Sequence, residues 1–360
     1  MLNEGIQVHE VAFCLFCKAK GMILYEKMRD RLFGASGEWD LFRCSQCGLV
    51  WLNPRPIFEH IEKTYLDYYT HVSDNANSSK PRLAFLRNKV KHALLATVFG
   101  YDNLISDKSS QWFGKILGFI QPLRELAGLS VMNFPANKKG ILLDVGCGNG
   151  GFLAWMRNLG WKVIGVEPDP EASKVALKKF GIDVYRCTLE EAGFPEKSFD
   201  AITLRHVVEH LPNPIATLAE CRRVLKDNGQ ITVLTPNIES LGHSMFGRSW
   251  LLLDPPRHFY LFSPLTLRLC AQQAGLTILQ LRTITRGAGG IWVTSRLIRR
   301  KGWLSGGWPT KINWRLRLGE LTFRALEHML CTVKEKGEEI FMAAIKNLAH
   351  DGIERLSRRE

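Results

Sequence analysis

Residues 141–152 read Ile-Leu-Leu-Asp-Val-Gly-Cys-Gly-Asn-Gly-Gly-Phe and give the strongest structural signal in the chain. The apolar run from Ile141 to Val145 is typical of a buried strand, and Phe152 opens a run with the apolar spacing of a helix. The turn between them is rich in glycine, which tolerates positive φ and lets a ligand lie against the backbone. The helix N-terminus beyond the turn offers free N–H groups. The stretch therefore predicts a strand, a turn and a helix that bind a ligand.

Two ligands fit such a turn. Gly146, Gly148 and Gly151 satisfy the G-x-G-x-x-G spacing of dinucleotide-binding proteins. Asp144 argues against a dinucleotide, because a carboxylate two residues before the first glycine would repel a diphosphate. The same carboxylate suits a ligand that carries an ammonium group, and this describes S-adenosylmethionine. An NAD(P)-dependent oxidoreductase and an ordinary turn without ligand are the alternatives.

A second acidic residue supports S-adenosylmethionine. Glu167 closes the predicted strand 163–166 and lies 23 residues after Asp144. A carboxylate in that place can accept hydrogen bonds from both hydroxyls of a ribose. The glycine turn alone is a weak signal, but the turn and the two carboxylates together predict a site for this cofactor.

The residues that follow alternate between predicted strands and helices. Further strands are expected at 184–187, 199–204 and 230–235. Repeated βα units imply a parallel sheet with helices on both faces, and ligands bind at the carboxyl ends of its strands. The candidate cofactor residues at that edge are Asp144, Gly146, Gly148, Glu167, Pro168, Leu189, Glu190, Arg205 and His206.

Length and composition indicate a globular protein of two or three units, with 360 residues of which 46% are hydrophobic. The first residues lack the pattern of a signal peptide, and no apolar run of about 18 residues predicts a membrane span. Nine cysteines, four of them paired as C-x-x-C, fit a reducing cytoplasm. The net charge of +13 lies mainly in the flanks, residues 1–139 and 282–360. Such flanks could attract an anionic membrane, a phosphorylated substrate or nucleic acid, or could serve solubility alone.

Two C-x-x-C pairs open the chain. Each pair makes a tight knuckle that aims two sulfur atoms at one point, and two such knuckles can complete a tetrahedral site. A unit of this size has little core of its own, so a metal would supply much of its folding energy. We expect structural zinc on Cys14, Cys17, Cys44 and Cys47. A redox dithiol and an unmetallated relic are the alternatives.

Residues 57–139 read as helical, with a short helix and a tyrosine cluster at 57–69 and a loop at 70–80. An apolar face is expected at Trp112, Phe113, Ile116, Leu117 and Ile120, before Pro122 interrupts it. Two interpretations are open for this segment. It could be a lid over the cofactor cleft, which we favour, or a helix that lies in a membrane interface.

Residues 140–240 resemble the class I S-adenosylmethionine-dependent methyltransferases, and within them the ubiquinone-biosynthesis-like group. The resemblance rests on Asp144–Gly148 (DVGCG), Ser198–Asp200 (SFD) and His206–Pro214 (HVVEHLPNP). Trp250 and the run Pro256–Ser263 resemble a signature of bacterial members with an N-terminal zinc knuckle pair, which are often linked to sugar, polysaccharide or lipid modification. The resemblance covers nearly the whole chain except residues 287–335.

This resemblance implies an α/β fold: a seven-stranded, doubly wound, Rossmann-like sheet whose last strand is antiparallel. Residues 277–285 fit its sixth strand and residues 337–346 its seventh. It also implies that a subset of the candidates lines the cofactor site, namely Asp144, Gly146, Gly148, Glu167, Leu189 and His206.

The run His206-Val-Val-Glu209-His210 has a second interpretation. It matches H-x-x-E-H, a zinc-peptidase motif, but that motif needs one continuous helix and Pro212 follows at once. Some relatives hold a divalent ion at the matching positions, and here His206 replaces the first acid, which argues against Mg²⁺. The favoured interpretation is that Glu209 and His210 brace the following helix.

Residues 238–263 read as an insertion after the fifth strand. Within it, Arg257 could hold an acidic group of the substrate, since arginine recognises carboxylate and phosphate. His258 could take a proton near neutral pH, with His206 as the second choice of base. Trp250 could stack on a substrate or belong to the core. We therefore name His258, His206 and Arg257 as candidate catalytic residues, with a surface loop pair as the alternative for Arg257 and His258.

Residues 287–335 combine a basic run, Arg299–Lys301, with four tryptophans: Trp292, Trp303, Trp308 and Trp314. Basic and aromatic residues interleaved in this way suit a membrane surface, where tryptophan lies at the headgroups. They would also suit nucleic acid, but no RNA or DNA module accompanies them. We prefer a lipid or lipid-linked substrate, with peripheral contact to the inner face of the membrane.

The sequence thus predicts a cytoplasmic methyltransferase that acts on a small-molecule, sugar or lipid-linked acceptor, most readily at oxygen. A zinc-ribbon binding protein with an inactive methyltransferase core is an alternative from another class. The expected parts are a zinc-ribbon-like unit at 1–56, a helical lid or linker at 57–139, an S-adenosylmethionine-binding core at 140–286 with the insertion 238–263, a basic, Trp-rich insertion at 287–335, and a last strand and tail at 336–360.

Overall fold

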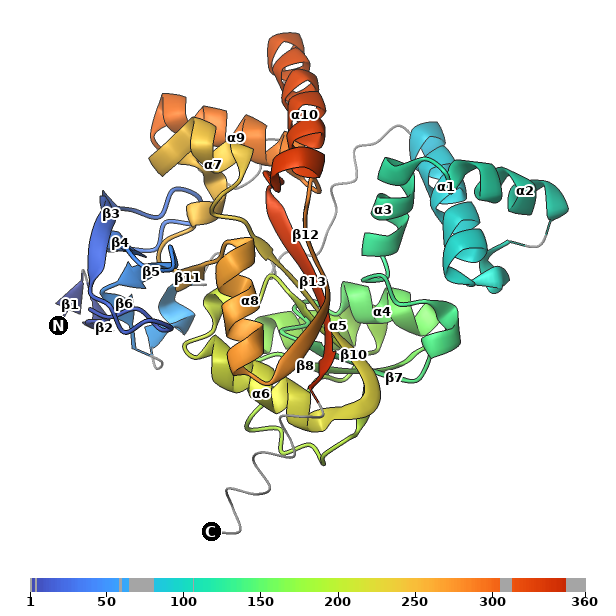
Figure 1. Ribbon diagram of the computed structural model, residues 1–360, viewed down its shortest axis with the longest axis horizontal. Helices are drawn as coiled ribbons and strands as arrows, with labels where there is room; N and C mark the ends of the chain where they lie inside the picture. The colour runs from blue at the N-terminus through green and yellow to red at the C-terminus, as the bar shows by residue number, and fades with distance from the viewer. Residues whose placement is uncertain are drawn as a thin grey trace. The chain divides into compact units, whose positions relative to one another are not determined.

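The computed structural model describes residues 2–3, 5–57, 60–64, 81–105, 107–304 and 313–347. They belong to two compact units (Figure 1). The first unit takes its residues from Met1–Tyr69, Leu204–Arg223 and Val233–Glu360, and the second from Thr70–Thr203 and Val224–Thr232. The predicted tyrosine cluster, the loop 70–80, Trp308 and the C-terminal tail beyond residue 347 lie outside the described residues.

The central sheet has the order β12-β13-β10-β9-β7-β8. Its strands are β7 (Ile141–Val145), β8 (Lys162–Val166), β9 (Phe199–Arg205), β10 (Leu225–Pro236), β12 (Leu276–Ile284) and β13 (Glu339–Lys346). Strands β9 and β10 each contribute residues to both units. The predicted third strand is reduced to a single bridge, in which Tyr185 pairs in parallel with Val166 of β8. The bridge occupies the seventh strand position, so the predicted α/β fold class is confirmed.

Strand register explains why the cofactor candidates converge. β7 and β8 are parallel, with Asp144 opposite Gly165 and Val145 opposite Val166. Both strands therefore end at the same edge of the sheet. β12 and β13 pair antiparallel along their length, as expected for the last two strands of this fold.

The helices around this sheet begin and end at the expected signals. They are α4 (Gly151–Asn158), α5 (Pro170–Phe180), α6 (Pro214–Val224) and α8 (Pro264–Gln273). The side chain of Asp169 caps the N-terminus of α5, and Gly181 ends that helix in the left-handed conformation. Ser263 forms a capping box at the start of α8.

A second sheet, of order β11-β5-β4-β3, carries the cysteine pairs in the first unit. Its strands are β3 (Gly21–Met28), β4 (Trp39–Cys44), β5 (Val50–Asn53) and β11 (Tyr260–Leu261). Strand β11 comes from the insertion 238–263, so the N-terminal segment and this insertion, predicted as separate parts, share one sheet. A three-stranded sheet of β1 (Leu2–Asn3), β2 (Ile6–His9) and β6 (Arg55–Pro56) lies in the same unit.

Three further helices belong to the first unit: α7 (Leu241–Phe246), α9 (Ala288–Lys301) and α10 (Trp314–Lys334). Gly319 lets α10 approach α9 closely, because a Cβ there would lie only 2.2 Å from the ring of Trp292. Trp292 is buried, whereas Trp303 and Trp314 are exposed. Short 3₁₀ segments complete the described elements: Glu62–Thr64, Asp102–Leu104, Ala136–Lys138, Val208–His210, Gly247–Ser249 and Leu251–Leu253.

The predicted helical segment is present in the second unit as α1 (Pro81–Phe99), α2 (Lys108–Leu117) and α3 (Gln121–Leu129). Gly114 lets α2 pack on α1, since a Cβ at this position would meet the carbonyl oxygen of Ala93 at 2.5 Å. The opposite face leaves Trp112 68% exposed, and Phe119, just beyond α2, is 90% exposed. Among the described helices, none combines the length and the apolar character that a membrane span requires.

Candidate active site and metal centre

The glycine turn after β7 is built by backbone conformation. Gly146, Gly148 and Gly150 all have positive φ, at 64°, 54° and 75°. The N–H groups of Gly146 and Cys147 both donate to the carbonyl oxygen of Val166 at the end of β8. The turn is therefore fixed to the neighbouring strand, and glycine is required because other residues rarely adopt these angles.

Asp144 is the last polar residue of β7 before the turn. Its side chain is buried, and Oδ1 accepts a short hydrogen bond from the hydroxyl of Thr203 on β9. Sequence reasoning did not single out Thr203. Its position near the end of the neighbouring strand was the available signal, because a polar residue in an apolar strand often has a buried partner.

Glu167 follows β8 directly and holds the turn from the other side. Its Oε2 accepts the N–H of Gly148 at 2.8 Å, and its Oε1 accepts the N–H of Asp169 at 3.0 Å. Burial raises the pKa of Glu167, and Asp144 adds to the increase, whereas these two N–H groups oppose it. Each carboxylate oxygen retains capacity for a further hydrogen bond, so the geometry is compatible with a ribose.

The remaining predicted cofactor residues lie in loops and at a strand end. The loop with Leu189 and Glu190 follows the bridge at Tyr185, which pairs with β8; Leu189 is buried and Glu190 exposed. Pro168 is exposed after Glu167, and Arg205 ends β9 half-buried. In the second unit, the structure therefore brings Asp144, Glu167, the glycine turn and the loop 188–190 to the carboxyl ends of neighbouring strands. Their contacts with a cofactor stay a prediction.

Sequence comparison identifies the family. A family model described as methyltransferase domain matches residues 120–281. A ubiquinone biosynthesis O-methyltransferase of Rhodopseudomonas palustris (strain HaA2) is 32% identical over 174 residues, which are 42% of this chain and 68% of that protein. The chain belongs to the class I S-adenosylmethionine-dependent methyltransferases. S-adenosylmethionine is accordingly its methyl donor.

Two other similarities of this methyltransferase differ in identity and extent. The protein of the same name from Bradyrhizobium sp. (strain ORS 278) is 37% identical over 125 residues, and the chain spans only 48% of that relative's length. A solved S-adenosylmethionine-dependent methyltransferase from Archaeoglobus fulgidus is 20% identical, with a TM-score of 0.43, and the match covers 65% of this chain and all of that one. The oxidoreductase and inactive-core alternatives find no support in these similarities.

The first unit of the methyltransferase holds His206 in an ion-pair network. The residue follows β9 with a positive φ of 56°. Its Nε2 lies 2.9 Å from Glu339, its Nδ1 lies 3.4 Å from Glu209, and its side chain is one-third exposed. Burial alone would lower the pKa of His206, but the two carboxylates outweigh burial and raise it to about 9. The predicted reserve role as a base does not fit, because the ring is already protonated at neutral pH.

This network predicts a pH-dependent contribution to stability. Since the pKa of His206 is raised from 6.5 to about 9 on folding, the contribution is complete below pH 6.5 and is lost as the pH rises through 9. We expect Glu339→Gln to lower the free energy of unfolding by about 1–2 kcal/mol at the acidic end of this window, and by much less at its alkaline end.

Urea unfolding at both ends of the window measures this effect. Burial also raises the pKa of Glu327 to about 9 and that of Glu338 to about 7, so wild type itself loses stability over this range. The informative quantity is therefore the difference between variant and wild type. Glu239→Gln, at an exposed acid of the same unit, is the control. An equal loss at both pH values would contradict the ion-pair explanation.

Arg257, predicted to bind an acidic group of the substrate, is fully buried instead. Its Nε and Nη2 atoms both donate to Asp254, and its Nη1 donates to Asp30 at 2.7 Å and to the carbonyl oxygen of Thr64 at 3.0 Å. These partners accept hydrogen bonds from all three nitrogen atoms of the guanidinium group. The predicted substrate contact is therefore wrong for this conformation, and Arg257 holds the β3 end of the N-terminal segment to the insertion.

His258, the first choice of base, is 5% exposed. Its Nδ1 lies 2.8 Å from the carbonyl oxygen of Leu252, and its ring packs edge-on against His210 with centroids 4.7 Å apart. A side chain held in this way has no access to an acceptor in solution, so the geometry does not support the predicted role as a base. Trp250 is also a core residue, and its Nε1 donates to Glu338.

Glu209 and His210, predicted to brace the following helix, contact β10 and the insertion 238–263 instead. Glu209 accepts a hydrogen bond from Thr235 on β10 at 2.8 Å, and His210 Nδ1 lies 3.0 Å from the carbonyl oxygen of Arg257. Burial lowers the pKa of His210 to about 4. Ligand atoms of Glu209, His210 and His258 lie within 4.8 Å of one another, whereas His206 faces carboxylates instead and is not part of this set.

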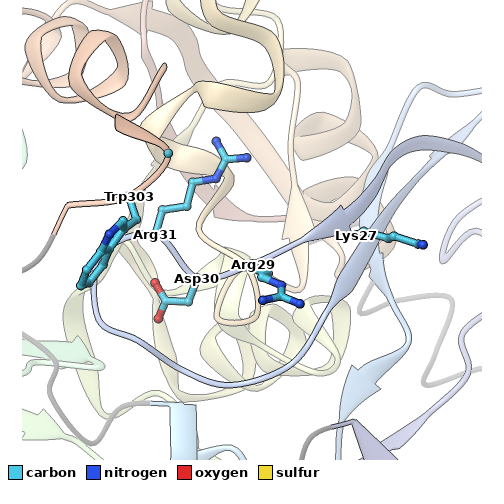
Figure 2. Close-up of a pocket in the computed structure, with 6 residues that line it drawn as sticks. Lys27, Arg29, Asp30, Arg31 and Trp303 are labelled. Atoms are coloured by element: carbon cyan, nitrogen blue, oxygen red, sulfur yellow. The ribbon is translucent and has the colours of Figure 1, made fainter. Parts of the chain in front are cut away.

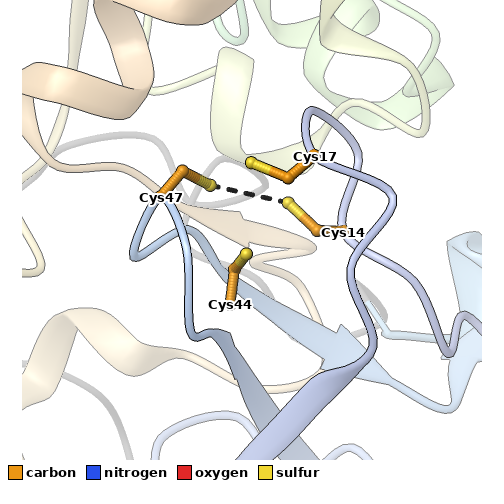
Figure 3. Close-up of side chains that lie close together, drawn as sticks. All are labelled: Cys14, Cys17, Cys44 and Cys47. Carbon is orange, nitrogen blue, oxygen red and sulfur yellow. Dashed lines mark hydrogen bonds between the residues drawn. The ribbon is translucent and has the colours of Figure 1, made fainter.

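The four N-terminal cysteines converge on one point (Figure 3). Their sulfur atoms lie within 4.8 Å of one another, and those of Cys14 and Cys47 are 3.6 Å apart. In each knuckle a backbone N–H donates to the first cysteine's carbonyl oxygen, from Lys18 to Cys14 and from Gly48 to Cys44. Burial would raise the pKa of the Cys44 thiol, but N–H groups of its own knuckle and the other thiols bring it to about 7. The donor set and its geometry fit a tetrahedral zinc site.

Proposed function

We propose that this methyltransferase acts on an oxygen atom of a small-molecule, sugar or lipid-linked acceptor. One observation carries the assignment of the donor site: two carboxylates, Asp144 and Glu167, end neighbouring parallel strands on either side of a glycine turn. Asp144 would hold the ammonium group of S-adenosylmethionine, and Glu167 its ribose hydroxyls. The loop at Leu189 and Glu190 would meet the adenine. The names of the relatives, O-methyltransferases, support oxygen as the acceptor atom.

The residues of the chain supply alignment in this proposal. The bound donor supplies a methyl group that its sulfonium charge already activates. Orientation of two reactants can contribute roughly 7–11 kcal/mol to the lowering of a barrier. Since neither His258 nor His206 fits the role of a base, we favour an acceptor oxygen acidic enough to lose its proton to water, such as a phenol or an acid, over an aliphatic hydroxyl.

Two further proposals concern the parts outside the sheet. Cys14, Cys17, Cys44 and Cys47 would hold structural zinc, because the site offers four thiols and no open position for catalysis. The exposed apolar face of α2, with Trp112 beside Lys108 and Lys115, supports peripheral contact with an anionic membrane or a lipid-linked acceptor. Closure of this segment as a lid remains the other interpretation of the same face.

A binding assay followed by an acceptor screen tests the function. S-adenosylhomocysteine at 100 times its dissociation constant should stabilise the folded protein by about 2.7 kcal/mol, and NADH should not. Release of S-adenosylhomocysteine from S-adenosylmethionine is then measured with phenols, acids, nucleotide-sugars and polyprenyl-linked compounds, the last in vesicles. Stabilisation by NADH alone, or by neither ligand, would contradict the proposal.

A further inference from the structure

A cavity of about 460 Å³ lies in the first unit, beside the loop that follows β3 (Figure 2). It is lined by Lys27 of β3, by Arg29, Asp30 and Arg31 on the loop, and by Gly302 and Trp303 after α9. The N–H of Leu304 donates to the carbonyl oxygen of Arg31 at 2.8 Å and fastens the two sides to each other. The function proposed above does not use this cavity.

Arg31, which lines the cavity, lies next to a second arginine, Arg248, which is outside the lining. Arg31 Nη1 donates to the carbonyl oxygen of Arg248 at 2.6 Å. The Nη2 atoms of both arginines lie 3.9 Å from the same sulfur atom, that of Met28. Arg248 Nη2 also donates to the carbonyl oxygen of Glu26. All of these acceptors are neutral, and within the described ranges neither arginine forms an ion pair.

The acidic residues near the cavity do not neutralise this pair. Asp30 accepts hydrogen bonds from the N–H groups of Leu32, Phe33 and Ala35, and its charge is matched by Arg257. Glu38 forms its ion pair with Arg29 at 2.8 Å. Burial lowers the pKa of Arg31, and the nearby charge of Arg248 lowers it further. The two guanidinium groups therefore repel each other, and an anion beside Arg31 in the cavity would relieve this repulsion.

The side chains that line the cavity indicate which kind of anion it could bind. An arginine fork binds phosphate oxygens in pairs, and Arg31 together with the exposed Lys27, both in the lining, suits more than one phosphate group. Trp303 is 58% exposed and offers an aromatic face beside the basic groups. We propose that this cavity binds a diphosphate ester, with Arg31 and Lys27 at the diphosphate and Trp303 against the attached organic group.

This proposal rests on the proposed function only in treating the ester as the acceptor or part of it. A diphosphate could arrive on a nucleoside or on a lipid, and the chemistry of recognition at Arg31 would be the same. The organic group that Trp303 contacts distinguishes the two sources. Binding can be measured without methyl transfer, so the two proposals can fail separately.

Isothermal titration of the full chain at low salt provides the test, with pyrophosphate, uridine diphosphate and geranyl diphosphate as probes. We expect pyrophosphate to bind and one of the two esters to bind more tightly. Arg31→Gln should weaken all three by roughly tenfold, as expected for a lost charged hydrogen bond. Trp303→Ala should remove the advantage of the ester and leave pyrophosphate unchanged.

Two further variants test whether the loss of binding is specific to the cavity. Lys27→Gln changes an exposed side chain, so the variant should fold normally and should weaken the binding of pyrophosphate about threefold. Arg315→Gln, at an exposed arginine of α10, should change nothing. No binding of any probe by the wild type, or equal losses in Arg31→Gln and Arg315→Gln, would overturn the proposal. If S-adenosylhomocysteine failed to bind while pyrophosphate bound, the proposed function would fall and this site would stand.

Discussion

Replacing Cys44 by serine is expected to leave the first unit without the proposed zinc ion and to destabilise it by several kcal/mol. Structural zinc is worth on the order of 10–16 kcal/mol of apparent binding free energy, and in small units this energy supports folding. Cys44 is the last residue of β4, which lies between β3 and β5 in the second sheet. A lost ligand at this point would loosen the strand that holds the sheet together.

Metal content and unfolding should change together in this experiment. The purified wild type should carry one zinc ion per chain, and a strong chelator should lower its stability in the same way as Cys44→Ser. Limited proteolysis should then cut between the two knuckles. Cys187→Ser, at a half-exposed cysteine outside the cluster, is the matched control and should keep the metal. A wild type that is free of zinc and indifferent to the chelator would refute the assignment.

Local sequence patterns correctly predicted the elements whose structure depends on only a few neighbouring residues. The strand, turn and helix at 141–152 appeared as expected, because an apolar run, a glycine turn and a helix start each act over a few residues. The cysteine knuckles converged for the same reason, since the geometry of C-x-x-C is set within each pair. The antiparallel last strand followed from the family resemblance.

The sequence-based predictions were wrong where contacts with distant parts of the chain determine the environment of a side chain. Arg257 reads as a ligand-binding residue in a polar loop, but its partner Asp30 lies 227 residues away, and no local pattern announces that contact. His206 reads as a base, yet Glu339 from β13 keeps it protonated. His258 likewise reads as a base, but the fold packs it against His210. Each error concerns a charged or titratable side chain whose environment is set by distant parts of the chain.

The prediction of a third strand at residues 184–187 was wrong for a different reason. Residues 184–187 contain the alternation of a strand, but only Tyr185 forms a ladder contact with β8. Val184 is buried and its neighbours Tyr185 and Arg186 are exposed, so the segment packs through one side chain at the edge of the sheet. An edge segment with so little buried surface gains little from extending its pairing.

Asp144→Asn is expected to weaken binding of S-adenosylhomocysteine by about 10- to 100-fold, the range for loss of one charged hydrogen bond. The substitution removes the negative charge that would hold the ammonium group and keeps the shape of the side chain. Asparagine retains an oxygen that can accept the hydroxyl of Thr203, so the contact between β7 and β9 can persist.

The same variant should fold at least as well as the wild type, and this separates a binding role from a structural one. Asp144 is buried near Glu167, and its charge repels that carboxylate and adds to the burial that raises the pKa of Glu167. Burial also raises the pKa of the Cys147 thiol, and the two carboxylates add to the increase. Removing one charge relieves that repulsion. Titration calorimetry and thermal unfolding should therefore move in opposite directions for Asp144→Asn, whereas Asp183→Asn, at an exposed aspartate of the same unit, should change neither. If Asp144→Asn lost stability and binding in parallel, the role of the carboxylate would be to stabilise the sheet. The assignment of Asp144 as the ammonium-binding residue would then be wrong.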